Sequence, residues 1–134
     1  MQMKYMLDTH TWIWWRMNPK KLSQKVKKII ESTNSYDEIL LSAISPWEFS
    51  KLLEKKKIGI SCDSEEWINS ALDMPKFRLI ALSPVLAYRS TVLPQPFHSD
   101  PADQIIVATA REENATILTK DERILTYDNV RSLW

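Results

Sequence analysis

The stretch Lys4-Tyr5-Met6-Leu7-Asp8 contains the feature that decides the fold, a short apolar strand that ends on a carboxylate. A second apolar strand at residues 116–118 is followed three positions later by Asp121. Between the two, short apolar runs alternate with longer amphipathic ones, as in strands that alternate with helices. This alternation predicts an α/β fold with a parallel sheet, helices on both faces and a ligand site outside the carboxyl ends of the strands.

Strands and helices are predicted along the whole chain from these patterns. The strands are expected at residues 4–7, 38–42, 78–82, 116–118 and 130–134. The helices are expected at residues 22–32, 45–57, 64–73, 83–93, 100–113 and 121–127. Ser-Pro pairs predict helix starts at Ser45 and Ser83, because serine caps a helix and proline fits its first position. Glu48, three residues after Ser45, completes the signature of a capping box.

Length and composition favour a single domain over residues 1–134. The chain is 44% hydrophobic and 26% charged, as is usual for soluble globular proteins. A formal net charge of +1 gives no bulk attraction for nucleic acid, so any attraction must come from local patches. The only cysteine, Cys62, excludes an internal disulfide and fits a cytoplasmic protein. We expect no signal peptide and no membrane span, because no apolar run is long enough.

Four carboxylates from separate segments are expected at one edge of the sheet: Asp8, Glu48, Asp103 and Asp121. Asp8 and Asp121 follow strands, and Glu48 and Asp103 lie in the first turns of helices that start near the same edge. Each acid alone also has a capping explanation, since first-turn acids are stabilised by the helix dipole by ~0.3–1 kcal/mol. Together the acids would repel one another unless a cation neutralised them.

Oxygen ligands favour hard cations, so the expected cofactor is Mg²⁺ or Mn²⁺. Cys62, His10 and His98 do not have the spacing of a zinc site. Metal-bound carboxylates suit hydrolysis of phosphodiesters, in which water is the nucleophile and no protein nucleophile is needed. The only glycine, Gly59, leaves no glycine-rich phosphate loop.

Asp100 requires a separate interpretation. It lies one turn before Asp103 on the same helix face, so it could join the metal site. Pro101 follows it, which is typical of a helix N-cap whose oxygens accept bonds from backbone N–H groups. The cap is the favoured interpretation, and metal binding is the alternative.

Four motifs in this order resemble those of the PIN-domain ribonucleases, particularly the VapC-like toxins of type II toxin–antitoxin pairs. They are residues 6–12 (MLDTHTW), 42–48 (SAISPWE), 98–110 (HSDPADQIIVATA) and 118–121 (LTKD), and the ending at 127–134 is similar too. One position departs from the family pattern, because Gln104 stands where related sequences often carry a basic residue.

The resemblance implies an α/β/α sandwich with a central, mainly parallel sheet of four to five strands. It implies a metal-dependent endoribonuclease that acts on RNA and has a cognate antitoxin protein as partner. Carried over by motif, the metal-site and catalytic acids are Asp8, Glu48, Asp103 and Asp121. Thr119 would be a polar helper among the catalytic residues, and Thr9 a weaker candidate for that role.

Several other side chains have both a structural and a functional interpretation. The Trp12–Trp15 segment is expected either in the core or in a homodimer or antitoxin interface, and stacking on unpaired RNA bases is a lesser alternative. The lysines at positions 20, 21, 25, 27 and 28 are the better candidates for RNA backbone contact. Those at 51, 55, 56 and 57 are expected to lie too far along their helix to reach the metal site. His10 and His98 could line the cleft or simply be packed or solvated.

Two other functions remain open from the residues alone. A phosphatase with Asp8 as covalent nucleophile is disfavoured, because the common pattern has a second aspartate where this chain has His10. A binding module that keeps the fold without catalysis is disfavoured by the complete set of acids.

Overall fold

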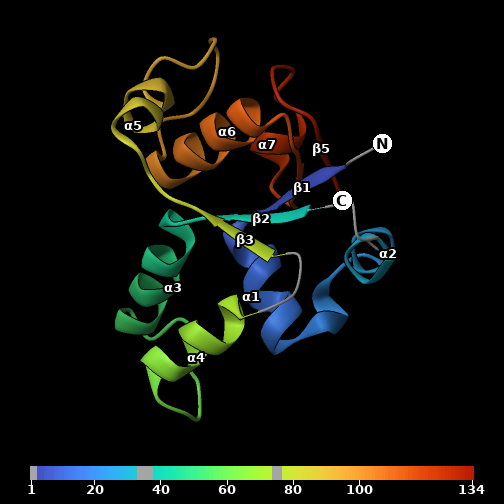
Figure 1. Ribbon diagram of the computed structural model, residues 1–134, viewed down its shortest axis with the longest axis vertical. Coiled ribbons are helices and arrows are strands. Elements are labelled where there is room, and N and C mark those ends of the chain that lie inside the picture. Colours follow the sequence, from blue (N-terminus) through green and yellow to red (C-terminus); the bar gives the residue numbers. More distant parts are fainter. Residues whose placement is uncertain (1–2, 33–37, 74–76) are drawn as a thin grey trace.

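A parallel sheet forms the centre of the computed structural model, which describes residues 3–32, 38–73 and 77–134 (Figure 1). Within these ranges the sheet has five strands, in the order β3-β2-β1-β4-β5, and every neighbouring pair is parallel. The strands are β1 (Lys4–Leu7), β2 (Glu38–Ser42), β3 (Phe77–Ile80), β4 (Thr116–Leu118) and β5 (Ser132–Leu133). The predicted central parallel sheet is therefore confirmed.

Helices cover both faces of the sheet, which makes the predicted α/β/α sandwich. They are α1 (Thr9–Met17), α2 (Gln24–Ser32), α3 (Ile44–Glu54), α4 (Ser64–Leu72), α5 (Pro84–Ser90), α6 (Pro101–Glu113) and α7 (Glu122–Leu125), with a 3-10 turn at Pro19–Lys21. In Figure 1, α5, α6 and α7 lie on one side of the strands, and α1, α3 and α4 lie on the other. No helix in the described ranges has the length and apolar character needed to cross a bilayer.

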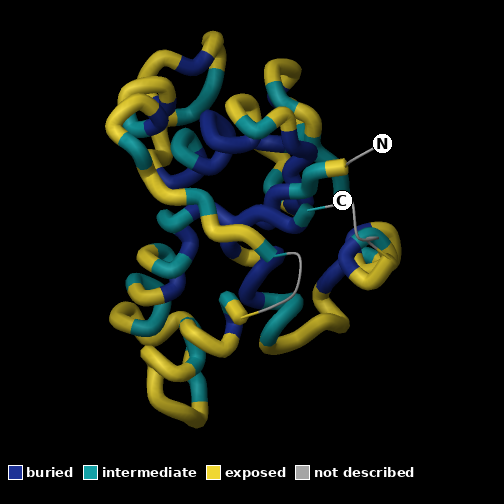
Figure 2. The backbone as a smooth tube through the Cα atoms, viewed as in Figure 1, coloured by how far each residue is buried: buried dark blue, intermediate teal, exposed yellow. Residues whose placement is uncertain are grey.

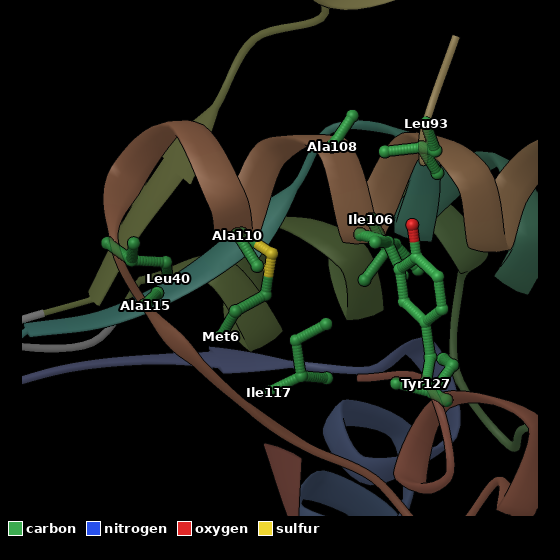
Figure 3. Close-up of a cluster of buried hydrophobic side chains, with 11 residues drawn as sticks. Met6, Leu40, Leu93, Ile106, Ala108, Ala110, Ala115, Ile117 and Tyr127 are labelled. Atoms are coloured by element: carbon green, nitrogen blue, oxygen red, sulfur yellow. The ribbon is translucent and has the colours of Figure 1, made fainter. Parts of the chain in front are cut away.

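Alternate residues of the central strands build two separate cores, one on each face. Met6 and Ile117 point toward α6, where they pack with Leu40 and Ile106 (Figure 3). The next residues along the strands, including Leu7, belong to the core on the α1 side. Figure 2 shows β2, β4 and α6 largely buried, while the edge strand β3 and the outer turns of the other helices are more exposed. Burial on both faces explains why the strands are almost continuously apolar.

The Trp-rich segment after β1 is a helix, α1, that the sequence patterns did not predict. Asp8 is its N-cap, and its side chain accepts a hydrogen bond from the Thr9 N–H. Trp12 is fully buried and makes edge contacts with Phe49 and Trp67 at centroid distances of 6.0 and 5.4 Å. Trp12 is therefore a core residue, and the interpretation of this tryptophan as part of a protein interface is wrong.

The start of α3 also differs from the prediction. The helix begins at Ile44 with Ala43 at the cap position, and the Ile44 N–H donates to the hydroxyl of Ser42 at 3.1 Å. Ser45 is a buried helical residue, so the predicted capping box with Glu48 is wrong. Ser83, Asp100 and Asp121, in contrast, cap α5, α6 and α7 through bonds from backbone N–H groups.

The end of α3 comes at Glu54 rather than residue 57, because Lys56 takes the left-handed conformation with φ 57°. The N–H groups of Lys56 and Lys57 turn back to the carbonyls of Leu53 and Leu52. This pattern is a Schellman motif, which stops a helix and satisfies its last carbonyls.

Leu40 provides a test of the core on the α6 side. Leu40→Ala removes a fully buried side chain, so we expect unfolding in urea to show a stability lower by about 2–5 kcal/mol. The matched surface change Val92→Ala, at a residue 53% exposed, should stay within about 0.5 kcal/mol of the wild type. Equal losses of stability for the two variants would contradict the assigned core.

Candidate functional site

A hollow of about 420 Å³ lies at the carboxyl edge of the sheet, where the sequence predicted the acids to meet. We call it the acidic hollow. It is lined by Asp8, His10, Trp14, Glu48, Asp100, Asp103, Lys120, Asp121 and Arg123. All four predicted site acids and the alternative Asp100 thus line one space, although they come from four distant segments. The acids meet because β1, β2 and β4 end at the same edge of the sheet, where Leu7 is in register with both Leu41 and Leu118.

Asp8 is buried at the end of the central strand and both of its oxygens are bonded. Oδ1 accepts from the Thr9 N–H at 2.8 Å, and Oδ2 accepts from the Thr119 hydroxyl at 2.7 Å. Burial raises the pKa of Asp8 above its ordinary value, although these two hydrogen bonds act in the opposite direction. Thr119 also accepts from the Asp121 N–H at 3.0 Å. The Thr119 hydroxyl therefore ties together the ends of β1 and of β4.

Glu48 is held by a second threonine. The Thr9 hydroxyl donates to Oε1 of Glu48, and it lies 2.8 Å from the hydroxyl of Ser45. Because the single Thr9 proton is directed to Glu48, Ser45 is the donor to Thr9. Burial raises the pKa of Glu48, the bond from Thr9 lowers it, and the nearby charges of Asp8 and Asp100 raise it further. Ser45 thus positions the carboxylate through Thr9 instead of capping the helix.

Asp103 is a further buried acid of the hollow whose pKa is raised. Its pKa is raised from 3.8 to about 8, chiefly by burial and further by repulsion from the other four acids of the hollow. His98 Nε2 lies 3.2 Å from Asp103 Oδ2, but not in hydrogen-bonding alignment. Asp100 accepts the Asp103 N–H at 3.0 Å, which is the predicted N-cap bond, while it also lines the acidic hollow.

Arg123 is a member of the site that the sequence patterns did not reveal. Its guanidinium lies 3.0 Å from Asp121 Oδ2 and 3.4 Å from Asp103 Oδ2, so it bridges the two acids. Burial tends to raise the pKa of Asp121, but the hydrogen bonds and charge of Arg123 outweigh it and lower the pKa. The sequence signal for this contact was the position of Arg123 two residues after Asp121, which places the arginine in the first turn of the helix that Asp121 caps.

The histidines and Gln104 lie around the rim. His10 is exposed, lines the acidic hollow and has its ring 5.7 Å from that of Trp14. His98 accepts the Asp100 N–H on Nδ1 at 3.3 Å. The Gln104 side chain donates to the His98 carbonyl at 3.1 Å, so this departure from the family pattern fixes the loop that carries His98.

The donor set is chemically suited to a hard divalent cation. It offers carboxylate oxygens whose mutual repulsion a cation would relieve. As the side chains stand, the described residues include no group of three or more His, Cys, Asp or Glu arranged to hold a metal ion. Arg123 and the two threonines occupy oxygens of these acids instead. Metal binding at the acidic hollow would therefore require Arg123 to give up its contacts with Asp103 and Asp121.

Comparisons with known proteins agree with the fold. A sequence model of the PIN domain matches residues 5–130. Ribonuclease VapC22 of Mycobacterium tuberculosis is 32% identical over 126 residues, which cover 94% of this chain and 93% of that protein. Among solved structures, VapBC2 of Rickettsia felis bound to a promoter DNA fragment matches with a TM-score of 0.68 at 22% identity, over 98% of each chain. FitAcB of Neisseria gonorrhoeae matches with a TM-score of 0.67 at 19% identity, over 97% of this chain and 96% of that one.

The raised pKa of Asp103 predicts an unusual pH dependence of stability in metal-free protein. The folded state keeps a proton on Asp103 up to about pH 8, whereas the unfolded chain releases it near 3.8. Stability therefore falls as pH rises through this window. Urea unfolding in EDTA should give a lower unfolding free energy at pH 8.5 than at pH 5.5.

Asp103→Asn is the control for this measurement. It should reduce the difference between the two pH values, with a remainder from Asp8 and Glu48, whose pKa values are also raised. An unchanged pH difference in the variant would show that Asp103 does not hold the proton.

Proposed function

The chain belongs to the PIN-domain family, and from this premise we propose that it is an endoribonuclease that hydrolyses RNA phosphodiester bonds with Mg²⁺ or Mn²⁺. One observation carries the proposal: carboxylates from four separate segments line a single hollow at the carboxyl edge of the sheet. Capping explains one such acid at a time, but it gives no reason for all of them to meet. The 32% identity with a ribonuclease over most of the chain supports the same conclusion.

The proposed metal ligands are Asp8, Glu48, Asp103 and Asp121, with Asp100 as an additional candidate. A bound divalent cation would supply an activated water and would stabilise charge on the leaving oxygen. Thr119 fixes the orientation of Asp8, and Thr9 fixes that of Glu48. Asp103 must lose its proton to serve as a ligand, so metal affinity should increase with pH. Arg123, once released from Asp121, is a cation at the rim that can meet a phosphate.

We also propose that the protein is the toxin of a toxin–antitoxin pair, with a protein antitoxin as its partner. The support is the relation to a VapC protein and the likeness to structures of VapBC and FitAcB. A small open reading frame beside this gene, whose product co-purifies with the chain and inhibits cleavage, is the result expected. The homodimer expected from the sequence stays a prediction.

Asp8→Asn tests the nuclease. Purified wild-type protein should cleave single-stranded RNA with Mn²⁺ or Mg²⁺ and lose activity in EDTA. Asp8→Asn should lower cleavage by at least about 100-fold, because removing groups that merely orient metal ligands already lowers activity 10–100-fold. Glu122→Gln is the matched control, since Glu122 adjoins Asp121 but does not line the acidic hollow. A folded Asp8→Asn variant with full activity would refute the proposal.

Thr119→Val tests the positioning of the acids. The change keeps the shape of the side chain but removes the bond to Asp8 and the acceptor for the Asp121 N–H. Calorimetry should show Mn²⁺ affinity about 10–100-fold lower, while Thr119→Ser should keep most of it. Equal affinities for the valine and serine variants would mean that this hydroxyl does not orient the metal ligands.

A further inference from the structure

A second hollow, of about 270 Å³, adjoins the acidic hollow along α3. We call it the lysine hollow, because Lys51, Lys55 and Lys57 line it together with Trp47 and Leu52. His10, Glu48 and Asp100 line both spaces, so the two hollows adjoin. As expected from the sequence, the lysines at positions 51, 55, 56 and 57 do not line the acidic hollow itself; three of them line the space beside it.

Trp47 is the aromatic element of the lysine hollow. It is 55% exposed, whereas Trp12 of the neighbouring helix is fully buried. The Nζ atom of Lys51, one turn further along α3, lies 5.8 Å from the centroid of the Trp47 ring. A largely exposed aromatic ring beside a cation is a surface on which a nucleobase can stack.

The end of α3 supplies the positive charge. The left-handed turn at Lys56 leaves Lys55 and Lys57 on the lining of the hollow, while Lys56 is not part of it. Lys51 is paired with Glu54 at 3.3 Å. In the described part of the chain, no carboxylate forms an ion pair with Lys55 or Lys57. Their charges are thus available to an anionic ligand.

We propose that the lysine hollow is a nucleotide subsite that binds a base and phosphate of single-stranded RNA next to the scissile phosphate. Trp47 stacks on the base, and Lys55 and Lys57, with Lys51, bind the phosphate. The inference rests on the proposed nuclease function, because Glu48 and Asp100 connect the subsite to the acidic hollow. Charge supports RNA as the occupant: with a net charge of only +1, the chain needs local cations to hold a polyanion beside its acids.

Binding to RNA tests the subsite directly. A labelled single-stranded RNA oligonucleotide is titrated with full-length Asp8→Asn protein, and fluorescence anisotropy reports the affinity. Adding Trp47→Ala should weaken binding roughly 5- to 100-fold, and Trp47→Phe should keep most of it. Tyr88→Ala, at a residue 65% exposed that lines neither hollow, should have no effect. If Trp47→Ala matches Tyr88→Ala, the stacking role is overturned.

The salt dependence of the same titration tests the lysines. Replacing Lys51, Lys55 and Lys57 by Gln should reduce the slope of log affinity against log salt by about 0.7 for each phosphate that is no longer neutralised. Lys56→Gly removes a charge from the same turn, and glycine adopts the left-handed backbone freely. If Lys56→Gly changes the slope as much as each lysine of the triple variant does, the proposal of a specific phosphate site is overturned. The triple variant also carries the test if Trp47→Ala does not fold.

Cleavage assays separate this inference from the proposed function. In protein that retains Asp8, Trp47→Ala should lower kcat/KM for RNA much more than it lowers kcat/KM for methyl 4-nitrophenyl phosphate, which has no neighbouring nucleotide to stack. If wild type cleaves neither substrate but RNA binding still depends on Trp47, the nuclease fails and the subsite stands. If wild type cleaves RNA and Trp47→Ala only prevents binding of a protein antitoxin, the surface is a protein interface and the subsite is overturned.

Discussion

The burial of the Asp8 carboxylate at the end of the central strand is the constraint on which the rest of the site depends. A carboxylate in such a place is stabilised only when its oxygens are hydrogen-bonded. The Thr9 N–H meets this need from the first residue of α1, and Thr119 meets it from the end of β4. The bonds of Asp8 therefore link the start of α1 to the ends of β1 and β4. The register of the strands then brings the other acids to the same edge.

Repulsion among these acids is relieved in the metal-free protein by protons and by arginine. Asp103 keeps a proton far above the usual range, and Arg123 bridges Asp121 and Asp103. A divalent cation would replace both, since it neutralises more charge in less space. The same concentration of negative charge thus attracts Arg123 in the metal-free protein and would attract a metal ion. Arginine is suited to this exchange because it is exposed and can turn outward.

Sequence patterns predicted the parts of the fold in which local and tertiary forces agree. The strands at 4–7, 38–42 and 116–118 have their predicted bounds, because buried parallel strands are continuously apolar. The α1 helix was missed because its run of tryptophans has no clear polar face. Ser45 was misassigned because the same Ser-Pro spacing fits a cap and a buried hydroxyl that donates to Thr9. Only the partner, 36 residues away in sequence, distinguishes the two.

The α3 helix determines how the two hollows relate to each other. Trp47 and Lys51 are four residues apart, so they share one face, and Glu48 lies about 100° around the helix from Trp47. One rigid element therefore presents an acid to the acidic hollow and an aromatic ring with a cation to the lysine hollow. Glu48 and Ser45 tie α3 to α1, because both contact the hydroxyl of Thr9. The spacing between the reacting phosphate and a neighbouring base would then be set by helix geometry, which a flexible loop could not hold constant.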